Sequence, residues 1–138
     1  MGQQQLIFLI LGTIIVAISI TVGISLFRSN HTEAVGDEME ATIMAIAVDA
    51  KNYLVKPSSL GGGGGSFEGF TIPHRLQKSG GVTYALHGQL GESTVLIINA
   101  ATPEGNLNAV VRKTDQGFNI HWIGTQAYSS RKGEQVVQ

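Results

Sequence analysis

The sequence predicts an α+β protein in which a long N-terminal helix, apolar in its first half and amphipathic in its second, packs against a small antiparallel β-sheet. Three observations predict this fold. Residues 6–27 are an uncharged apolar run, and apolar residues then recur at helical spacing up to Pro57. Short segments of alternating polarity, separated by turns, fill most of the remaining chain.

The apolar run of residues 6–27 is long enough to cross a membrane. Its 22 residues, at about 1.5 Å rise per residue, form a helix of roughly 33 Å, against a bilayer core of about 30 Å. No positively charged region precedes the run and no clear small-x-small cleavage pattern follows it. The run therefore differs from an ordinary secretory signal, and we expect it to be retained in the mature protein.

A second helical pattern follows directly. We assign residues 1–28 to the apolar half of the helix and residues 29–57 to an amphipathic half, which together make one helix of about 50 residues. The apolar face of the second half is formed by Val35, Met39, Ile43, Ile46, Ala47, Ala50 and Leu54. Of these, Ile43, Ile46 and Leu54 are expected to pack against the head. Pro57 lacks the N–H that would continue the helix, so the helix ends before it.

Five consecutive glycines dominate the connection predicted at residues 58–69, namely Gly61, Gly62, Gly63, Gly64 and Gly65. A phosphate-binding loop would open a helix, often with a Lys-Ser/Thr pair, and neither follows here. We interpret the glycines as a connection whose backbone takes φ values closed to other residues, or packs closely on a neighbour. Phe67 and Phe70 would anchor this connection to an apolar surface.

Residues 70–128 predict an antiparallel meander of three or four short strands. The strand segments are 82–86, 94–100, 108–112 and 118–123, with a further extended segment at 70–72. The turns are expected at 78–81, 88–91, 103–106 and 115–117. The apolar face of this sheet needs a cover, which the helix before Pro57 can supply. Residues 129–138 are mostly polar and predict a tail.

The composition excludes several classes of function. Without cysteine the chain has no disulfide, thiolate metal site or cysteine nucleophile. Nine Lys and Arg residues face ten Asp and Glu residues without a basic block, which is not the pattern of a nucleic-acid binder. We predict no enzyme activity, metal or cofactor, because the four histidines show no short ligand spacing: His31, His74, His87 and His121. Three aromatic residues of the strands could form either a surface patch or part of the core, and we expect them to pack against the helix: Tyr84, Phe118 and Trp122.

The whole arrangement resembles the type IV pilin and pseudopilin family over nearly the whole chain. In that family the apolar half of the helix anchors the subunit in the inner membrane and later forms the filament core. The resemblance implies a structural subunit that polymerises with its own copies into an extracellular filament, with help from an assembly machinery. The alternative is a single-pass membrane protein or minor pseudopilin whose head binds a partner in a secretion or sensing complex.

The resemblance also directs attention to the chain start. Family members usually carry a glutamate at the fifth mature position, where it pairs with the N-terminal amine of a neighbouring subunit. If Met1 is retained, Gln5 stands there, and if cleavage follows Gly2, Ile7 is fifth. The amides of Gln3, Gln4 and Gln5 either accept hydrogen bonds from such an amine or mark the polar edge of the membrane.

The residues expected to make assembly contacts combine these glutamines with apolar side chains and with small residues that let helices approach closely. They are Gln3, Gln4, Gln5, Leu6, Phe8, Leu9, Gly12, Ile15, Val16, Ser19, Val22, Gly23 and Leu26.

Overall fold

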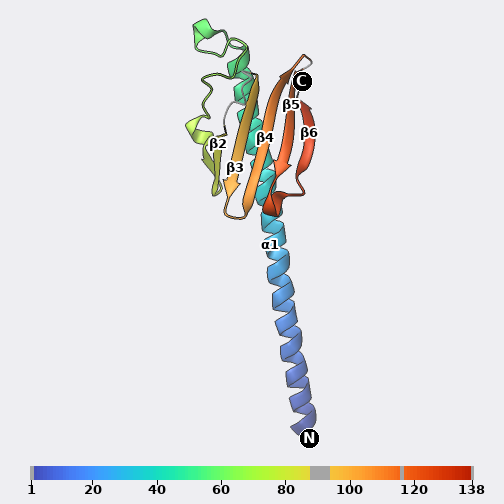
Figure 1. Cartoon of the computed structure of the whole chain (residues 1–138). Coiled ribbons are helices and arrows are strands. Elements are labelled where there is room, and N and C mark those ends of the chain that lie inside the picture. The colour runs from blue at the N-terminus through green and yellow to red at the C-terminus, as the bar shows by residue number, and fades with distance from the viewer. Residues whose placement is uncertain (1, 88–93, 116, 138) are drawn as a thin grey trace. The chain divides into compact units, whose positions relative to one another are not determined.

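A computed structural model describes residues 2–87, 94–115 and 117–137 (Figure 1). One helix, α1, spans Gly2–Val55, which confirms the long N-terminal helix. In the described part of the chain, three short 3₁₀ helices and six strands follow: η1 (Ser58–Leu60), η2 (His74–Leu76), β1 (Lys78–Ser79), β2 (Val82–Leu86), β3 (Val95–Thr102), β4 (Gly105–Thr114), β5 (Gly117–Gly124), η3 (Gln126–Tyr128) and β6 (Lys132–Val137). The chain divides into two compact units, Met1–Ala34 and Val35–Gln138, and we call the second unit the head.

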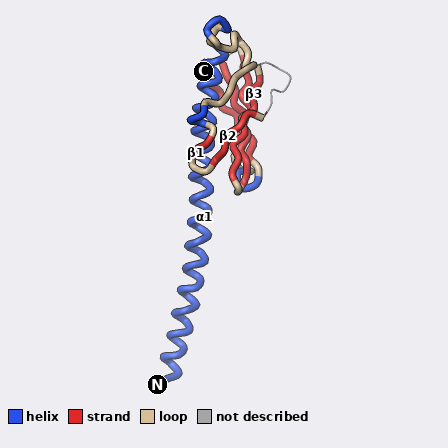
Figure 2. Tube along the Cα trace, turned by 90° about the vertical axis from the view of Figure 1, so that its left-hand side faces the viewer, coloured by secondary structure: helices blue, strands red, loops and turns tan. Residues whose placement is uncertain are grey.

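The sheet of the head is a simple meander in the order β1-β2-β3-β4-β5-β6, with every neighbouring pair antiparallel. Figure 2 shows its strands lying beside the part of α1 that belongs to the head. The longest pairing joins β3 to β4, from Val95 opposite Arg112 to Thr102 opposite Gly105. A connection of only two residues, Pro103 and Glu104, closes this hairpin, which agrees with the predicted turn.

The structure corrects the two ends of the predicted meander. Residues 132–137 are not a tail but the strand β6, paired with residues 118–123 of β5. The first four residues of β6, Lys132 to Gln135, include no large apolar side chain, so hydrophobic alternation gave no sign of this edge strand. Residues 70–72 are not a strand, because Pro73 follows them and the side chains of Phe70 and Ile72 are buried without joining the ladder. The short strand β1 comes later, so the sheet has six strands instead of three or four.

Two of the predicted turns involve residues outside the described part of the chain. The turn at 88–91 lies wholly outside it, and the turn at 115–117 includes Gln116, which is also outside it.

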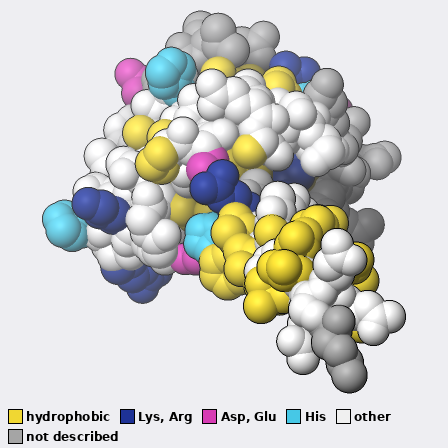
Figure 3. Space-filling model, turned by 90° about the horizontal axis from the view of Figure 1, so that it is seen from below, with side chains coloured by type: hydrophobic (Ala, Val, Ile, Leu, Met, Phe, Trp, Pro, Cys, Tyr) yellow, Lys and Arg dark blue, Asp and Glu magenta, His cyan; other side chains and the backbone are white. Residues whose placement is uncertain are grey.

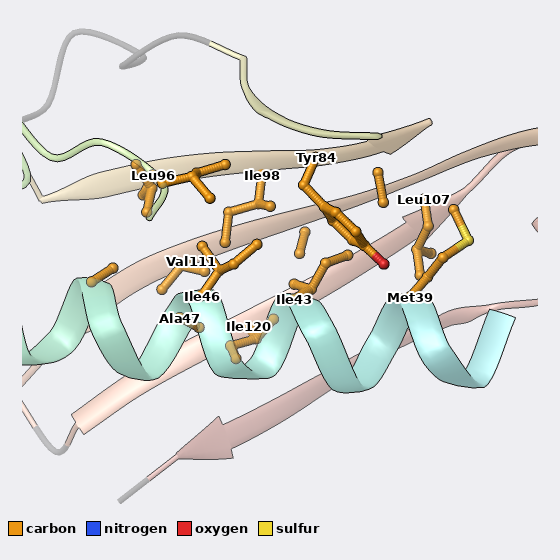
Figure 4. Close-up of a cluster of buried hydrophobic side chains, with 14 of the residues drawn as sticks. Met39, Ile43, Ile46, Ala47, Tyr84, Leu96, Ile98, Leu107, Val111 and Ile120 are labelled. Carbon is orange, nitrogen blue, oxygen red and sulfur yellow. The ribbon is translucent and has the colours of Figure 1, made fainter. Parts of the chain in front are cut away.

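The core of the head lies between α1 and one face of the sheet (Figure 4). From α1, Ile43 and Ile46 are fully buried and Leu54 is 4% exposed. The sheet contributes alternate residues of its long strands: Leu96, Ile98, Ala100, Leu107, Ala109, Val111, Phe118, Ile120 and Trp122. Tyr84, Phe118 and Trp122 are all buried, which confirms the expected packing against the helix.

The glycine run folds back over the C-terminal end of α1. The N–H groups of Gly63 and Gly65 donate to the carbonyls of Tyr53 and Leu54, both at 2.8 Å. These carbonyls are among those that a helix end leaves without a partner. Gly65 has φ +100°, which strongly favours glycine. A Cβ atom at Gly63 would collide with the carbonyl oxygen of Ser66, so both predicted reasons for glycine apply in this loop.

Phe67 is fully buried and Phe70 is 8% exposed, so both anchor the connection in the core. Their burial fixes the path of the chain between the capped end of α1 and the first strand.

Candidate assembly surface

The first unit carries a large exposed apolar surface. Fifteen large hydrophobic side chains in residues 6–27 are each between 50% and 72% exposed. Figure 3 shows hydrophobic side chains gathered along this segment. By length and composition α1 is able to cross a membrane, with an 18-residue window of mean hydropathy 2.7 that is not buried. An apolar surface of this extent is typical of a membrane-spanning or protein-binding segment.

Polar side chains within this segment are bonded to their own helix. The hydroxyl of Thr13 donates to the carbonyl of Ile10 at 2.8 Å, and the Ser19 hydroxyl donates to the carbonyl of Ile15 at 2.8 Å. Thr21 makes the same kind of bond. A hydroxyl whose proton is already bonded enters an apolar environment at lower cost, as in membrane helices.

The small residues of the segment leave its surface open. Beyond their own helix, a Cβ atom added at Gly12 or Gly23 would meet no other atom within 4 Å. Gly12 and Ala17 line a shallow groove together with Phe8, Thr13, Val16 and Ile20. All of the predicted assembly residues, from Gln3 to Leu26, are exposed. Met1, which would carry the N-terminal amine if it is retained, lies outside the described residues.

Within the head, every charged residue of α1 between positions 35 and 55 contacts a residue beyond the helix. Glu38 accepts a hydrogen bond at 2.8 Å from the hydroxyl of Ser79, the last residue of β1. Asp49 pairs with Arg75 at 3.1 Å, and the Lys51 ammonium lies 5.6 Å from the centre of the Phe118 ring. The remaining two, Asp37 and Glu40, share one arginine.

Arg131 joins these last two carboxylates. Its Nη1 atom lies 2.6 Å from Glu40 Oε1, and its Nη2 atom lies 2.8 Å from Asp37 Oδ1. Burial lowers the pKa of Arg131, but the hydrogen bonds and charges of Glu40 and Asp37 outweigh this effect and raise the pKa above its usual value. The guanidinium lies against Gly36, where a Cβ atom would be 2.6 Å from its Cζ atom. Gly36 therefore makes room for this contact.

We expect the Arg131→Gln substitution to lower the free energy of unfolding of the head by about 1–2 kcal/mol, because it leaves two carboxylates without their cation. Urea unfolding of the full chain in detergent, followed by the fluorescence of the single buried tryptophan Trp122, measures this change. The control is Arg112→Gln, at an exposed position on β4. Equal midpoints for the two variants would show that the Arg131 contacts contribute nothing.

Sequence reasoning missed these contacts of the head with α1. The signal was present in the helix, because none of the four acidic residues in these contacts has a basic residue four positions later. Asp37 is followed by Ala41, Glu38 by Thr42, Glu40 by Met44 and Asp49 by Tyr53. Acidic residues that lack partners on their own helix can pair with distant segments, and here Ser79 and Arg131 are such partners, from segments that had been assigned to a turn and to a tail.

The Tyr84 hydroxyl is a titratable group close to Glu38. Burial raises the pKa of the Tyr84 hydroxyl, the neighbouring Thr42 hydroxyl lowers it, and the charge of Glu38 raises it again, with a net rise. The phenol therefore stays neutral at physiological pH.

Among the residues that the structure describes, no group of three or more His, Asp or Glu side chains is placed to hold a metal ion. Comparisons with protein-family models, with curated proteins and with solved structures give no match to this chain.

Proposed function

We propose that this chain is a structural subunit that polymerises through its N-terminal apolar helix into an extracellular pilus-like filament. The observation that carries the proposal is the uncharged, exposed surface of residues 6–27 on a helix that continues into a folded head. The layout of apolar helix, amphipathic helix and antiparallel meander, which resembles that of the pilins, supports it. Before assembly the same segment would hold the subunit in the inner membrane.

The energy available from this surface is large. Burying one such side chain is worth about 1.5–3 kcal/mol, so a fully covered segment gains tens of kcal/mol. Lipid removes the segment from water just as effectively as another apolar helix does. The free energy of moving the segment from membrane to filament therefore depends on how closely the helices pack. The open positions at Gly12 and Gly23 allow such packing, and the self-bonded hydroxyls of Thr13 and Ser19 add little cost.

The partners that follow from this proposal are further copies of the chain, the inner membrane and an assembly machinery. The role is structural, without catalysis and without nucleic acid. A single-pass anchor for a head that binds another protein would use the same apolar surface, and the experiment below separates the two functions.

Electron microscopy of material sheared from the surface of cells that carry this chain tests the proposal. We expect thin filaments whose main protein, identified by mass spectrometry, is this chain, and their loss when its gene is deleted. Recovery of the chain only in the membrane fraction, with no filaments on the same cells, would support the single-pass anchor instead.

A further inference from the structure

The guanidinium group of Arg131 lies against α1 at Gly36, just before Met39, the first fully buried core residue of the helix. Its Nε, Cζ and Nη2 atoms are all too close to position 36 to leave space for a Cβ atom there. The same group pairs with Asp37 and Glu40, one and four positions further along α1. One arginine therefore holds three positions of the helix, and a side chain at position 36 would displace it.

The backbone of Arg131 is itself held in place. Its N–H donates to the carbonyl of Tyr128 at 3.0 Å, and its carbonyl accepts from the N–H of Gly124 at 3.0 Å. Tyr128 is only 1% exposed, so this turn is anchored in the core. The Arg131 side chain is 17% exposed. The guanidinium is thus presented to α1 from a fixed backbone, which limits the conformational freedom it loses on pairing.

The part of α1 that leads to this contact has little apolar burial. In residues 28–34 no side chain is buried, and all but Thr32 are exposed. Residues 29–32 and 35–36 are Ser, Asn, His, Thr, Val and Gly, all weaker helix formers than alanine or leucine, with glycine the weakest of them. We call residues 29–36 the weak stretch. A helical stretch with exposed backbone bonds and few apolar contacts opens at a low free energy.

We propose that Arg131 acts as a lock on α1: seated at Gly36 it keeps the weak stretch helical, and when it leaves, this stretch unwinds. Gly36 has two roles in this device. It makes room for the guanidinium, and it lowers the helix propensity at the place that the lock controls. Since the C-terminal segment of the head supplies Arg131, the folding of that segment sets the rigidity of α1. The inference does not depend on filament formation and goes beyond the proposed function.

The lock acts on the weak stretch through the hydrogen bonds of the helix. In an α-helix the carbonyls of residues 29–36 accept from the N–H groups of residues 33–40. Asp37 and Glu40, which bind the guanidinium, are among these donors. Unwinding of the weak stretch would move both carboxylates away from Arg131. Two charge-assisted hydrogen bonds to a mostly buried arginine oppose this movement more strongly than a fully exposed ion pair would.

Hydrogen exchange of the full chain in detergent tests the inference, because the amides of residues 33–40 lose protection when the weak stretch unwinds. We expect Arg131→Ala to accelerate their exchange about tenfold, and the amides of β3 and β4 to change much less. The matched control, Arg75→Ala, removes the ion pair with Asp49 further along α1 and should leave exchange at residues 33–40 unchanged. Equal acceleration in β3, β4 and residues 33–40 would mean that Arg131 stabilises the whole head and is no lock.

Gly36→Ala provides a second test, because the lock predicts opposite effects in two backgrounds. Combined with Arg131→Ala, it should slow exchange at residues 33–40 about fivefold, since alanine is the better helix former. In the unmodified chain the new methyl group displaces the guanidinium. Losing the lock then outweighs the gain in helix propensity, and exchange should become about twofold faster.

The comparison of these backgrounds decides the question. If Gly36→Ala slows exchange by the same factor with and without Arg131, the guanidinium does not need the glycine and the inference is wrong. The single variant is informative even if Arg131→Ala does not fold. Slower exchange at residues 33–40 in the Gly36→Ala chain would contradict the lock, and faster exchange would support it.

Discussion

A variant lacking residues 1–28 is expected to be soluble and monomeric, and to form no filaments. The deletion removes the exposed apolar surface but leaves the head complete, because every residue of the hydrophobic core, from Met39 to Tyr128, lies beyond the deletion. Losing tens of kcal/mol of possible apolar burial should abolish association. Size-exclusion chromatography with light scattering gives the mass, and electron microscopy shows whether filaments form.

Two controls accompany this deletion. Fluorescence of Trp122, which is 6% exposed, shows whether the shortened chain is folded. The full chain in detergent, transferred to detergent-free buffer, shows that association returns when residues 1–28 are present. Filaments formed by the shortened chain would mean that the head itself is the polymerising unit, and the proposed function would be wrong.

The Ile46→Asp substitution is expected to destabilise the head by several kcal/mol. Ile46 has no exposed surface and lies between α1 and the sheet, near Val111 (Figure 4). A carboxylate there would be buried without a partner, and a cost of this size is a large fraction of the roughly 5–15 kcal/mol that stabilises a typical domain. Urea unfolding at neutral pH, followed by Trp122 fluorescence, measures the loss.

The matched control is Val48→Asp, which places the same carboxylate two residues further along α1, on its exposed side. Its effect on the free energy of unfolding should stay within about 0.5 kcal/mol. If Ile46→Asp is as stable as Val48→Asp, the face of α1 that contains Ile46 does not pack against the sheet.

Hydrophobic periodicity predicted the parts of this fold whose stability comes from burial. Ile43, Ile46 and Leu54 follow the helical repeat, and each is buried in the head. The alternation at residues 82–86 coincides with β2. Where backbone pairing or an ion pair joins residues that the apolar pattern does not mark, as in β6 and at Arg131, that pattern carried no information.

The candidate assembly surface likewise has a part that the sequence predicts and a part that it does not. The apolar surface of residues 6–27 could be predicted because it depends on composition alone. The contacts between α1 and the rest of the head could not, because they depend on where Glu38 and Asp49 find their partners. Those partners, Ser79 and Arg75, lie 41 and 26 positions further along the chain.

The contacts of Arg131 can form only late in the synthesis of the chain. Its partners Glu40 and Asp37 lie 91 and 94 positions earlier in the chain. A ribosome that adds about 5–20 residues per second needs roughly 5–20 s to travel that distance. During this interval the apolar segment can already enter the membrane, while two carboxylates next to Gly36 still lack their cation. If the segment anchors the chain in a membrane as proposed, anchoring can precede completion of the head.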